Sequence, residues 1–186
     1  MKDSTIDPRR LDMRSFARDA GALSGLWPLQ ALQRLSASCE PALADATMPP
    51  VSWQAQGELR DVAGGPAQVW LHVDASAAVR LQCQRCLLPL QEVLTAKRSF
   101  LFVRDEAEAA RLDEEIEEDV LVLSRSLDVA ELVEDELILA LPLVPRHERC
   151  PEPLLAPAAG VVPVDEERRH PFAALEALRR TVPGGR

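Results

Sequence analysis

Aromatic side chains are scarce in this chain of 186 residues: tyrosine is missing, and tryptophan and phenylalanine together make up 4%. Proteins that bind single-stranded RNA commonly stack its bases on aromatic side chains, and this sequence offers no such platform. It also lacks a phosphate-cradling glycine loop, a GxSxG nucleophile elbow and an HExxH metal motif, and its three histidines are scattered. We therefore expect neither an enzyme nor a small-molecule substrate.

Long apolar runs are missing as well. The longest, residues 137–144, is interrupted by Pro142, whereas a membrane-spanning helix needs about 20 consecutive apolar residues. The N-terminal sequence MKDSTIDPRR carries charges where a signal peptide needs its apolar stretch. We expect a cytoplasmic protein without a membrane partner.

Acidic residues are abundant, and they are unevenly distributed. The net charge is −9, and residues 105–136 alone contain fourteen acids and two bases, whereas residues 1–36 carry a small positive excess. Because binding to RNA phosphates needs clusters of Lys and Arg, a basic protein is the expected partner, and direct RNA contact is left open. The candidate docking residues are Asp113, Glu114, Glu115, Glu117 and Glu118; the alternative is a solvated loop.

Four cysteines in a cytoplasmic chain of this length favour metal or redox chemistry over disulfides. Cys83 and Cys86 form a CxxC motif, and His147 and Cys150 form an HxxC motif. Together these residues could provide a tetrahedral zinc site assembled by folding. Leu87 stands where many zinc knuckles have glycine. Buried or turn cysteines without metal remain an alternative, and redox cycling is the least favoured. Cys39 is most simply a small buried apolar residue, although it could replace His147 as the fourth ligand.

The predicted fold is α+β, with a twisted antiparallel sheet covered by a helix. Apolar residues alternate through residues 51–59 and again through 69–83, which predicts two strands. A third strand returns after Cys86, so the CxxC motif lies at a hairpin tip and Cys83 faces inward. Residues 105–119 are predicted to be a loop or frayed helix, and residues 120–123 a short strand.

A helix is predicted over residues 128–141. Asp128 supplies a capping side chain at its start, and Pro142 ends it. Helical spacing puts Glu136 on the apolar face, where a carboxylate needs a partner, such as Arg85 or Arg146. The same spacing puts Glu134 off that face, so its removal should cost little.

Three segments are predicted from these patterns. Residues 1–48 form an N-terminal helical arm that packs on the rest of the domain, and residues 49–150 form the α+β core. Residues 151–186 form a proline-rich linker followed by a C-terminal tail helix.

The segments LQCQRCLLPL, VEDELILALPLVPRHERC and HPFAALEAL resemble the YceD family of large ribosomal RNA subunit accumulation proteins. The family's recurring cysteines match Cys83, Cys86 and Cys150, and His147 matches its PxH position; Cys39 matches none. The resemblance implies a non-enzymatic cytoplasmic factor that supports synthesis, processing or stability of large-subunit (23S) rRNA. We expect it to act in ribosome biogenesis through a large-subunit precursor, through contact with a basic ribosomal protein. The alternative hypothesis is a zinc- or thiol-based redox-sensing regulator.

Overall fold

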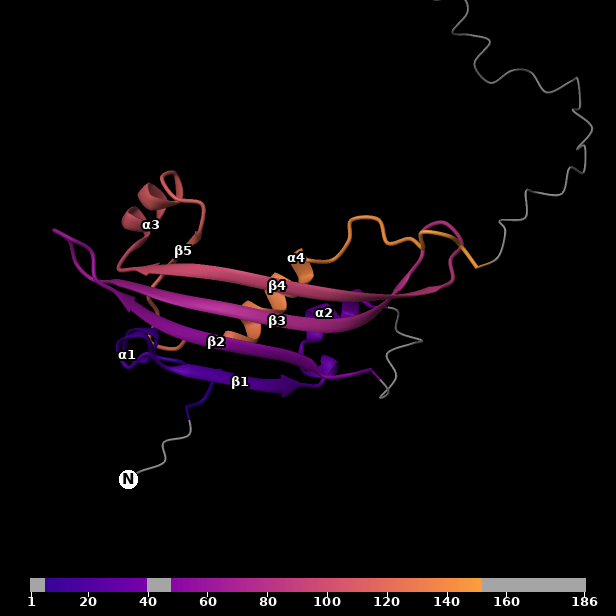
Figure 1. The fold of residues 1–186 in the computed structure, drawn as a ribbon, viewed down its shortest axis with the longest axis horizontal. Coiled ribbons are helices and arrows are strands. Elements are labelled where there is room, and N and C mark those ends of the chain that lie inside the picture. The colour runs from indigo at the N-terminus through magenta and orange to yellow at the C-terminus, as the bar shows by residue number, and fades with distance from the viewer. Residues whose placement is uncertain (1–5, 40–47, 152–186) are drawn as a thin grey trace, which may run out of the picture. The chain divides into compact units, whose positions relative to one another are not determined.

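The computed structural model describes residues 6–39 and 48–151, which build one five-stranded sheet in the order β1-β2-β3-β4-β5 (Figure 1). Neighbouring strands are antiparallel, except that β5 runs parallel to β4. The strands are β1 Ala22–Trp27, β2 Val51–Arg60, β3 Gln68–Gln82, β4 Pro89–Val103 and β5 Asp119–Val122. The helices are α1 Met13–Arg18, α2 Gln33–Ser38, α3 Glu106–Asp113 and α4 Val129–Leu139, with a 3-10 turn, η1, at Leu29–Ala31. The α+β class is confirmed, and the sheet is mixed because β5 joins it in parallel.

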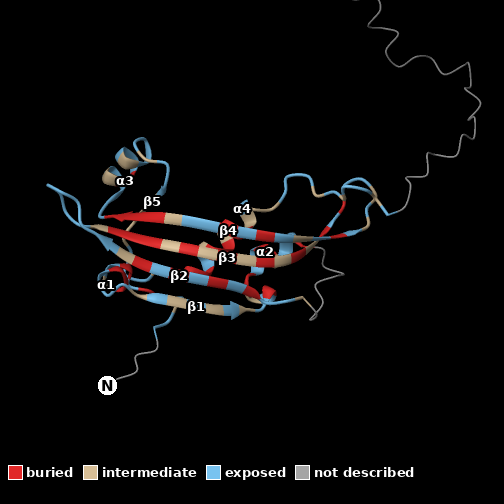
Figure 2. Ribbon diagram, in the orientation of Figure 1, coloured by how far each residue is buried: buried red, intermediate tan, exposed pale blue. Residues whose placement is uncertain are grey.

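The main core lies between one face of the sheet and helices α1, α2 and α4 (Figures 1 and 2). Alternate residues of β3 point into it and are buried, as the sequence pattern predicts: Val69, Leu71, Val73, Ala75, Ala77, Val79 and Leu81, with Cys83 following in the same alternation. Since successive side chains of a strand point to opposite faces, the β3 residues between them lie on the second face. The prediction of an inward-facing Cys83 is confirmed.

Helix α4 also follows its sequence signals. The Asp128 side chain accepts hydrogen bonds from the backbone N–H groups of Ala130 (2.8 Å) and Glu131 (3.2 Å). Val133 and Leu137 are fully buried against the sheet, and the helix ends at Leu139, three residues before Pro142. Asp128 therefore caps the helix that covers the sheet.

The N-terminal segment differs from a purely helical arm. Helix α1 is present, but residues 22–27 form β1, the edge strand beside β2. Gly25 lies opposite Trp53 in this pairing, and the Trp53 indole packs over it: an added Cβ would lie 3.1 Å from the indole nitrogen. Trp53 stacks on Trp27 with ring centroids 4.3 Å apart. The segment does pack on the domain, as predicted, because Met13 and Phe16 are buried in the main core.

The acidic segment contains a packed helix where a loop or frayed helix was predicted. Asp105 caps α3 by accepting a hydrogen bond from the Glu108 backbone N–H (2.9 Å). Ala109 belongs to a second, smaller core with Trp70 and Leu101 on the second face of the sheet. The helical alternative is confirmed for α3, but its packing was not predicted, because these few apolar contacts come from distant strands and leave little periodicity in the segment itself.

The predicted C-terminal tail helix lies outside the described residues. Within residues 6–39 and 48–151, no helix combines the length and apolar character needed to cross a membrane.

Candidate metal centre

The hairpin between β3 and β4 forms the first half of the cysteine–histidine cluster. The Cys83 backbone N–H donates to the Leu88 carbonyl (3.0 Å), and the Leu87 N–H donates to the Cys83 carbonyl (2.9 Å). Leu87 has a φ of 60°, the left-handed region that normally favours glycine. This tight turn places both sulfur atoms of the CxxC motif on the same side of the hairpin end.

The second half arrives from the segment after α4, which runs alongside the hairpin (Figure 1). Here the Gln84 N–H donates to the Pro145 carbonyl (2.8 Å), and the His147 N–H donates to the Cys83 sulfur (3.4 Å). These bonds join two parts of the chain more than 60 residues apart. They bring His147 and Cys150 to the CxxC motif.

Cys83, Cys86, His147 and Cys150 offer ligand atoms that all lie within 4.8 Å of one another, so the group could hold a metal ion. The His147 Nε2 lies 3.1 Å from the Pro89 carbonyl, which can only accept, so Nε2 carries the proton. In the neutral imidazole Nδ1 is then the unprotonated nitrogen, and it faces the Cys86 sulfur at 3.4 Å. A backbone carbonyl that orients the histidine in this way is a usual feature of metal sites, and three thiolates with one imidazole suit zinc.

The sulfur atoms have unequal acidities. Burial raises the pKa of the Cys83 thiol, but hydrogen bonds from the Cys86, Arg85 and His147 backbone N–H groups outweigh this effect and lower the pKa to about 5. Burial raises the pKa of Cys150, and its hydrogen bonds and charge interactions with Cys86 and Cys83 raise it further. Cys83 therefore ionises more readily than Cys150, and a bound cation would offset the cost of ionising Cys150.

Cys39 lies elsewhere and is not part of the group of four. Its side chain, just after the end of α2, is 5% exposed and donates to the Leu35 carbonyl within that helix (3.2 Å). Burial raises the pKa of its thiol. Cys39 thus occupies the place of a small buried side chain.

The candidate docking acids form a second site, which we call the acidic surface. It consists of the exposed residues Asp113, Glu114, Glu115, Glu117 and Glu118, at the end of α3 and in the turn that follows. Glu115 pairs with Arg111 at 2.8 Å. Leu112 and Ile116 pack against the smaller core and anchor this turn. The acidic surface and the cysteine–histidine cluster lie at opposite ends of β4 (Figure 1).

Glu136 is buried, but its partner differs from the predicted one. Its carboxylate pairs with the Arg98 guanidinium (3.0 Å), because α4 places it beside the middle of β4, away from the hairpin tip that carries Arg85. Burial raises the pKa of Glu136, and the Arg98 interaction offsets only part of this rise.

Glu134 has a role that helical spacing did not predict. It is 8% exposed, and its Oε1 accepts hydrogen bonds from the backbone N–H groups of Arg34 (2.6 Å) and Leu35 (3.1 Å). Its Oε2 pairs with the Arg34 guanidinium at 3.1 Å, and that guanidinium also pairs with Asp135. The expectation that Glu134 is dispensable rested on its position in one helix and missed the contact with α2.

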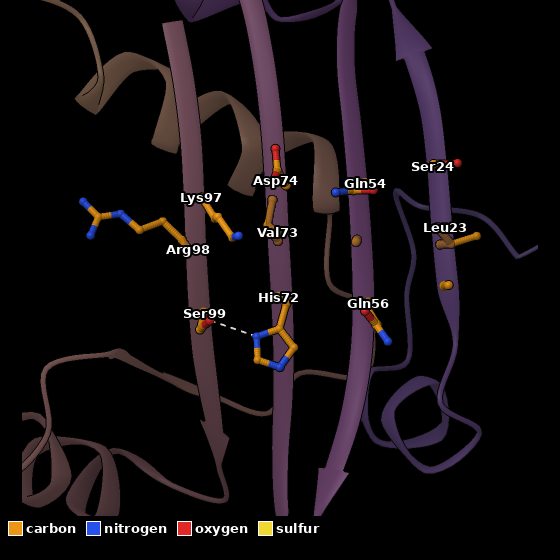
Figure 3. A pocket seen from close by; sticks show the side chains of 12 residues that line it. Leu23, Ser24, Gln54, Gln56, His72, Val73, Asp74, Lys97, Arg98 and Ser99 are labelled. Carbon is orange, nitrogen blue, oxygen red and sulfur yellow. Dashed lines mark hydrogen bonds between the residues drawn. The ribbon is translucent and has the colours of Figure 1, made fainter.

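The second face of the sheet carries a shallow polar hollow of about 430 Å³, away from the cluster (Figure 3). His72 lies in its floor, with Nδ1 2.8 Å from the Ser99 hydroxyl and Nε2 2.8 Å from Glu58. Arg98 points away from the hollow. No sequence motif marked these residues, because strands that are distant in the sequence bring them together.

Comparison with known proteins identifies the family. The family described as "Large ribosomal RNA subunit accumulation protein YceD" matches residues 71–179. The chain belongs to the YceD family. A Haemophilus influenzae protein of that same name is 31% identical over 184 residues, which cover 95% of each chain. The YceD match includes all four residues of the cysteine–histidine cluster and the whole acidic surface. No solved structure matches the chain.

Proposed function

We propose that this chain supports accumulation of the large-subunit ribosomal RNA as a non-enzymatic, cytoplasmic factor in ribosome biogenesis. Membership of the YceD family is the observation that carries the proposal. In this proposal the chain acts by binding a component of the large-subunit precursor and performs no chemistry on it.

The cysteine–histidine cluster is proposed to hold zinc in a structural role. Four protein ligands complete the tetrahedral coordination of zinc and leave no open position for water or substrate, unlike a catalytic site. The ion would fasten the hairpin tip to the segment after α4, two parts of the chain that share only a few hydrogen bonds. The role of the ion is therefore to stabilise that end of the sheet.

The acidic surface is proposed to bind a basic, Lys/Arg-rich protein of the assembling large subunit. Its five carboxylates are exposed, and α3 is already anchored to the sheet through Ala109, so little ordering is needed on binding. Association should be fast and sensitive to salt, because exposed charges are screened beyond about 8–10 Å at roughly 0.1–0.15 M salt.

The test replaces the five acids of the acidic surface with Asn or Gln and captures the tagged chain from growing cells. Recovery of large-subunit ribosomal proteins should fall, and cells that rely on the variant should accumulate less large-subunit rRNA. A matched control carries the same charge change at scattered positions: Asp19, Asp61, Asp74, Glu92 and Glu131. Recovery of precursors equal to that of the parent would show that the acidic surface is only solvated.

A redox-sensing regulator remains the second candidate, because three sulfur atoms lie within 4.8 Å of each other in the cluster. Under this alternative, mild oxidation should release the metal, form a disulfide and reversibly change the large-subunit rRNA level. Under the leading proposal, Cys86→Ser should lower the stability of the chain. The large-subunit rRNA level should respond to oxidant neither in cells with the parent chain nor in cells with the variant.

A further inference from the structure

Three arginines surround the cysteine–histidine cluster, and we call them the arginine tip: Arg85 within the CxxC loop, and Arg146 and Arg149 beside His147 and Cys150. All three are exposed, and in the described ranges their side chains form no hydrogen bond or ion pair. Among the other described arginines, Arg10, Arg14 and Arg125 likewise form no such pair, whereas seven have an acidic partner: Arg9, Arg18, Arg34, Arg60, Arg98, Arg104 and Arg111. Three of the six unpaired guanidinium groups among the described residues are therefore gathered at the tip.

The tip is held together by the same contacts that assemble the cluster. Arg85 lies between Gln84 and Cys86, and Arg146 lies between Pro145 and His147. The Gln84–Pro145 hydrogen bond of 2.8 Å and the 4.8 Å limit on the ligand atoms fix these two backbones side by side. The backbones that carry the arginines are thus ordered before any partner binds, which lowers the entropic cost of binding.

The net charge of −9 does not describe the local charge at the arginine tip. The arginine tip includes one acid, Glu148, and a zinc ion held by three thiolates and one imidazole would add a single negative charge. The tip remains positive. The acidic surface follows the far end of the 15-residue strand β4, roughly 45 Å away at about 3.3 Å per residue. This separation exceeds the screening length of about 8–10 Å several-fold, so the acids hardly weaken anion binding at the tip.

We infer that the arginine tip binds phosphate groups of RNA, while the acidic surface binds protein. The identification of that RNA as part of the large-subunit precursor rests on the proposed function. Guanidinium groups bind phosphate through paired, charge-assisted hydrogen bonds, and all three cations here are arginine. Leu87, which is 63% exposed in the same turn, offers an apolar contact for a sugar or base. With so few aromatics, the tip would position the chain on RNA without reading its sequence.

The expected salt dependence of RNA binding follows from the number of phosphate contacts. Three phosphate contacts on an RNA hairpin correspond to a slope of about −2 to −3 in log affinity against log salt concentration, at about 0.7 per contact for single strands and about 0.9 for duplex. Binding by the tip alone should therefore be weak and detectable mainly at low salt. It would orient the chain on a precursor that the acidic surface also binds.

The experiment measures binding of the zinc-loaded full chain to a labelled RNA hairpin by fluorescence anisotropy, at about 50 mM and about 200 mM salt. The test variant combines Arg85→Ala, Arg146→Ala and Arg149→Ala. The control combines Arg10→Ala, Arg14→Ala and Arg125→Ala, which removes equal charge at exposed positions elsewhere. The test variant should lose about tenfold in affinity and most of the salt slope, and the control should stay within about twofold of the parent. Zinc content should be unchanged in both, which shows that the tip variant is folded.

Two results would overturn the inference. Equal losses in both variants would mean that RNA responds only to overall charge, or contacts the N-terminal segment. Tip-dependent binding of poly-glutamate in preference to the hairpin would assign the tip to an acidic protein. Failure of the proposed function is distinguishable, because it is measured by protein capture through the acidic surface and by cellular rRNA level. If the tip variant loses RNA binding while the acidic-surface variant captures normally, the inference stands and the proposed protein docking fails.

Discussion

Replacing Glu134 with Ala should destabilise the protein more than replacing its neighbour on the same helix, Glu136. Helix α2 begins after Leu32, whose side chain cannot accept a hydrogen bond, so its first N–H groups need another acceptor. Glu134 of α4 supplies it, by accepting from the Arg34 and Leu35 N–H groups at 2.6 and 3.1 Å. A capping interaction that is usually local is made here between two helices about a hundred residues apart.

The expected loss of stability depends on which groups each substitution leaves without a partner. Loss of a helix cap costs about 1 kcal/mol, and a buried N–H without an acceptor costs about 1–3 kcal/mol. Because Leu35 is fully buried and the two effects overlap, we expect Glu134→Ala to cost about 2–3 kcal/mol. Glu136→Ala removes one ion pair with Arg98, whose side chain is 55% exposed and can turn to solvent, so it should cost less than about 1 kcal/mol.

Urea unfolding followed by circular dichroism measures both variants, with metal content held constant. Glu131→Ala serves as the control, because Glu131 is exposed on the same helix, and it should shift the midpoint little. The order of the urea midpoints shows which of the two glutamates contributes more to stability. Equal midpoints for the Glu134 and Glu136 variants, or a lower midpoint for Glu136→Ala, would refute the assignment of Glu134 as the cap of α2.

Three further outcomes are expected. Gently purified protein should contain about one zinc per chain by elemental analysis. Cys83→Ser should lower the free energy of unfolding far more than Cys39→Ser, because zinc contributes on the order of 10 kcal/mol to folding of such sites. A metal-free protein with freely titrating thiols would contradict both expectations. Leu87→Gly should raise the melting temperature of the zinc-loaded chain by relieving a left-handed backbone worth about 1 kcal/mol, whereas Leu87→Val should lower it. Because burial raises the folded pKa of Glu136, its contribution to stability is fully present at acid pH and is lost as pH rises above 4.5 through the folded pKa. Glu136→Gln should therefore reduce the loss of urea stability over that range, and an unchanged pH profile would show that Glu136 is solvated.

Several features were predictable because their signals are local and repeated. The alternation of apolar residues through β3 extends over fifteen positions, which specifies a strand and the inward direction of Cys83. Asp128 and Pro142 bound α4 through backbone hydrogen bonding within a few residues of each. Ligand chemistry alone suggested that the CxxC and HxxC motifs meet, and folding does bring all four residues together.

Other features depend on contacts that no local pattern contains. Residues 22–27 are a strand because β2 pairs with them at the edge of the sheet, although the segment was predicted to belong to a helical arm. Helix α3 is held by Ala109 packing on Trp70, which leaves only a few apolar positions in a very acidic segment.

The sequence by itself determined the long strands, the capped helix and the residue types of the candidate metal centre, because each depends on chemistry within a few neighbours. Only the tertiary structure decided which carboxylate is structural. Helical spacing distinguishes the two faces of α4, but it cannot show that α2 lies beside one of them with free N–H groups that need an acceptor. Likewise, the sequence gives each arginine the same charge. Whether a guanidinium is paired, as Arg98 is with Glu136, or free at the arginine tip depends on which acids the fold places within about 4 Å of it.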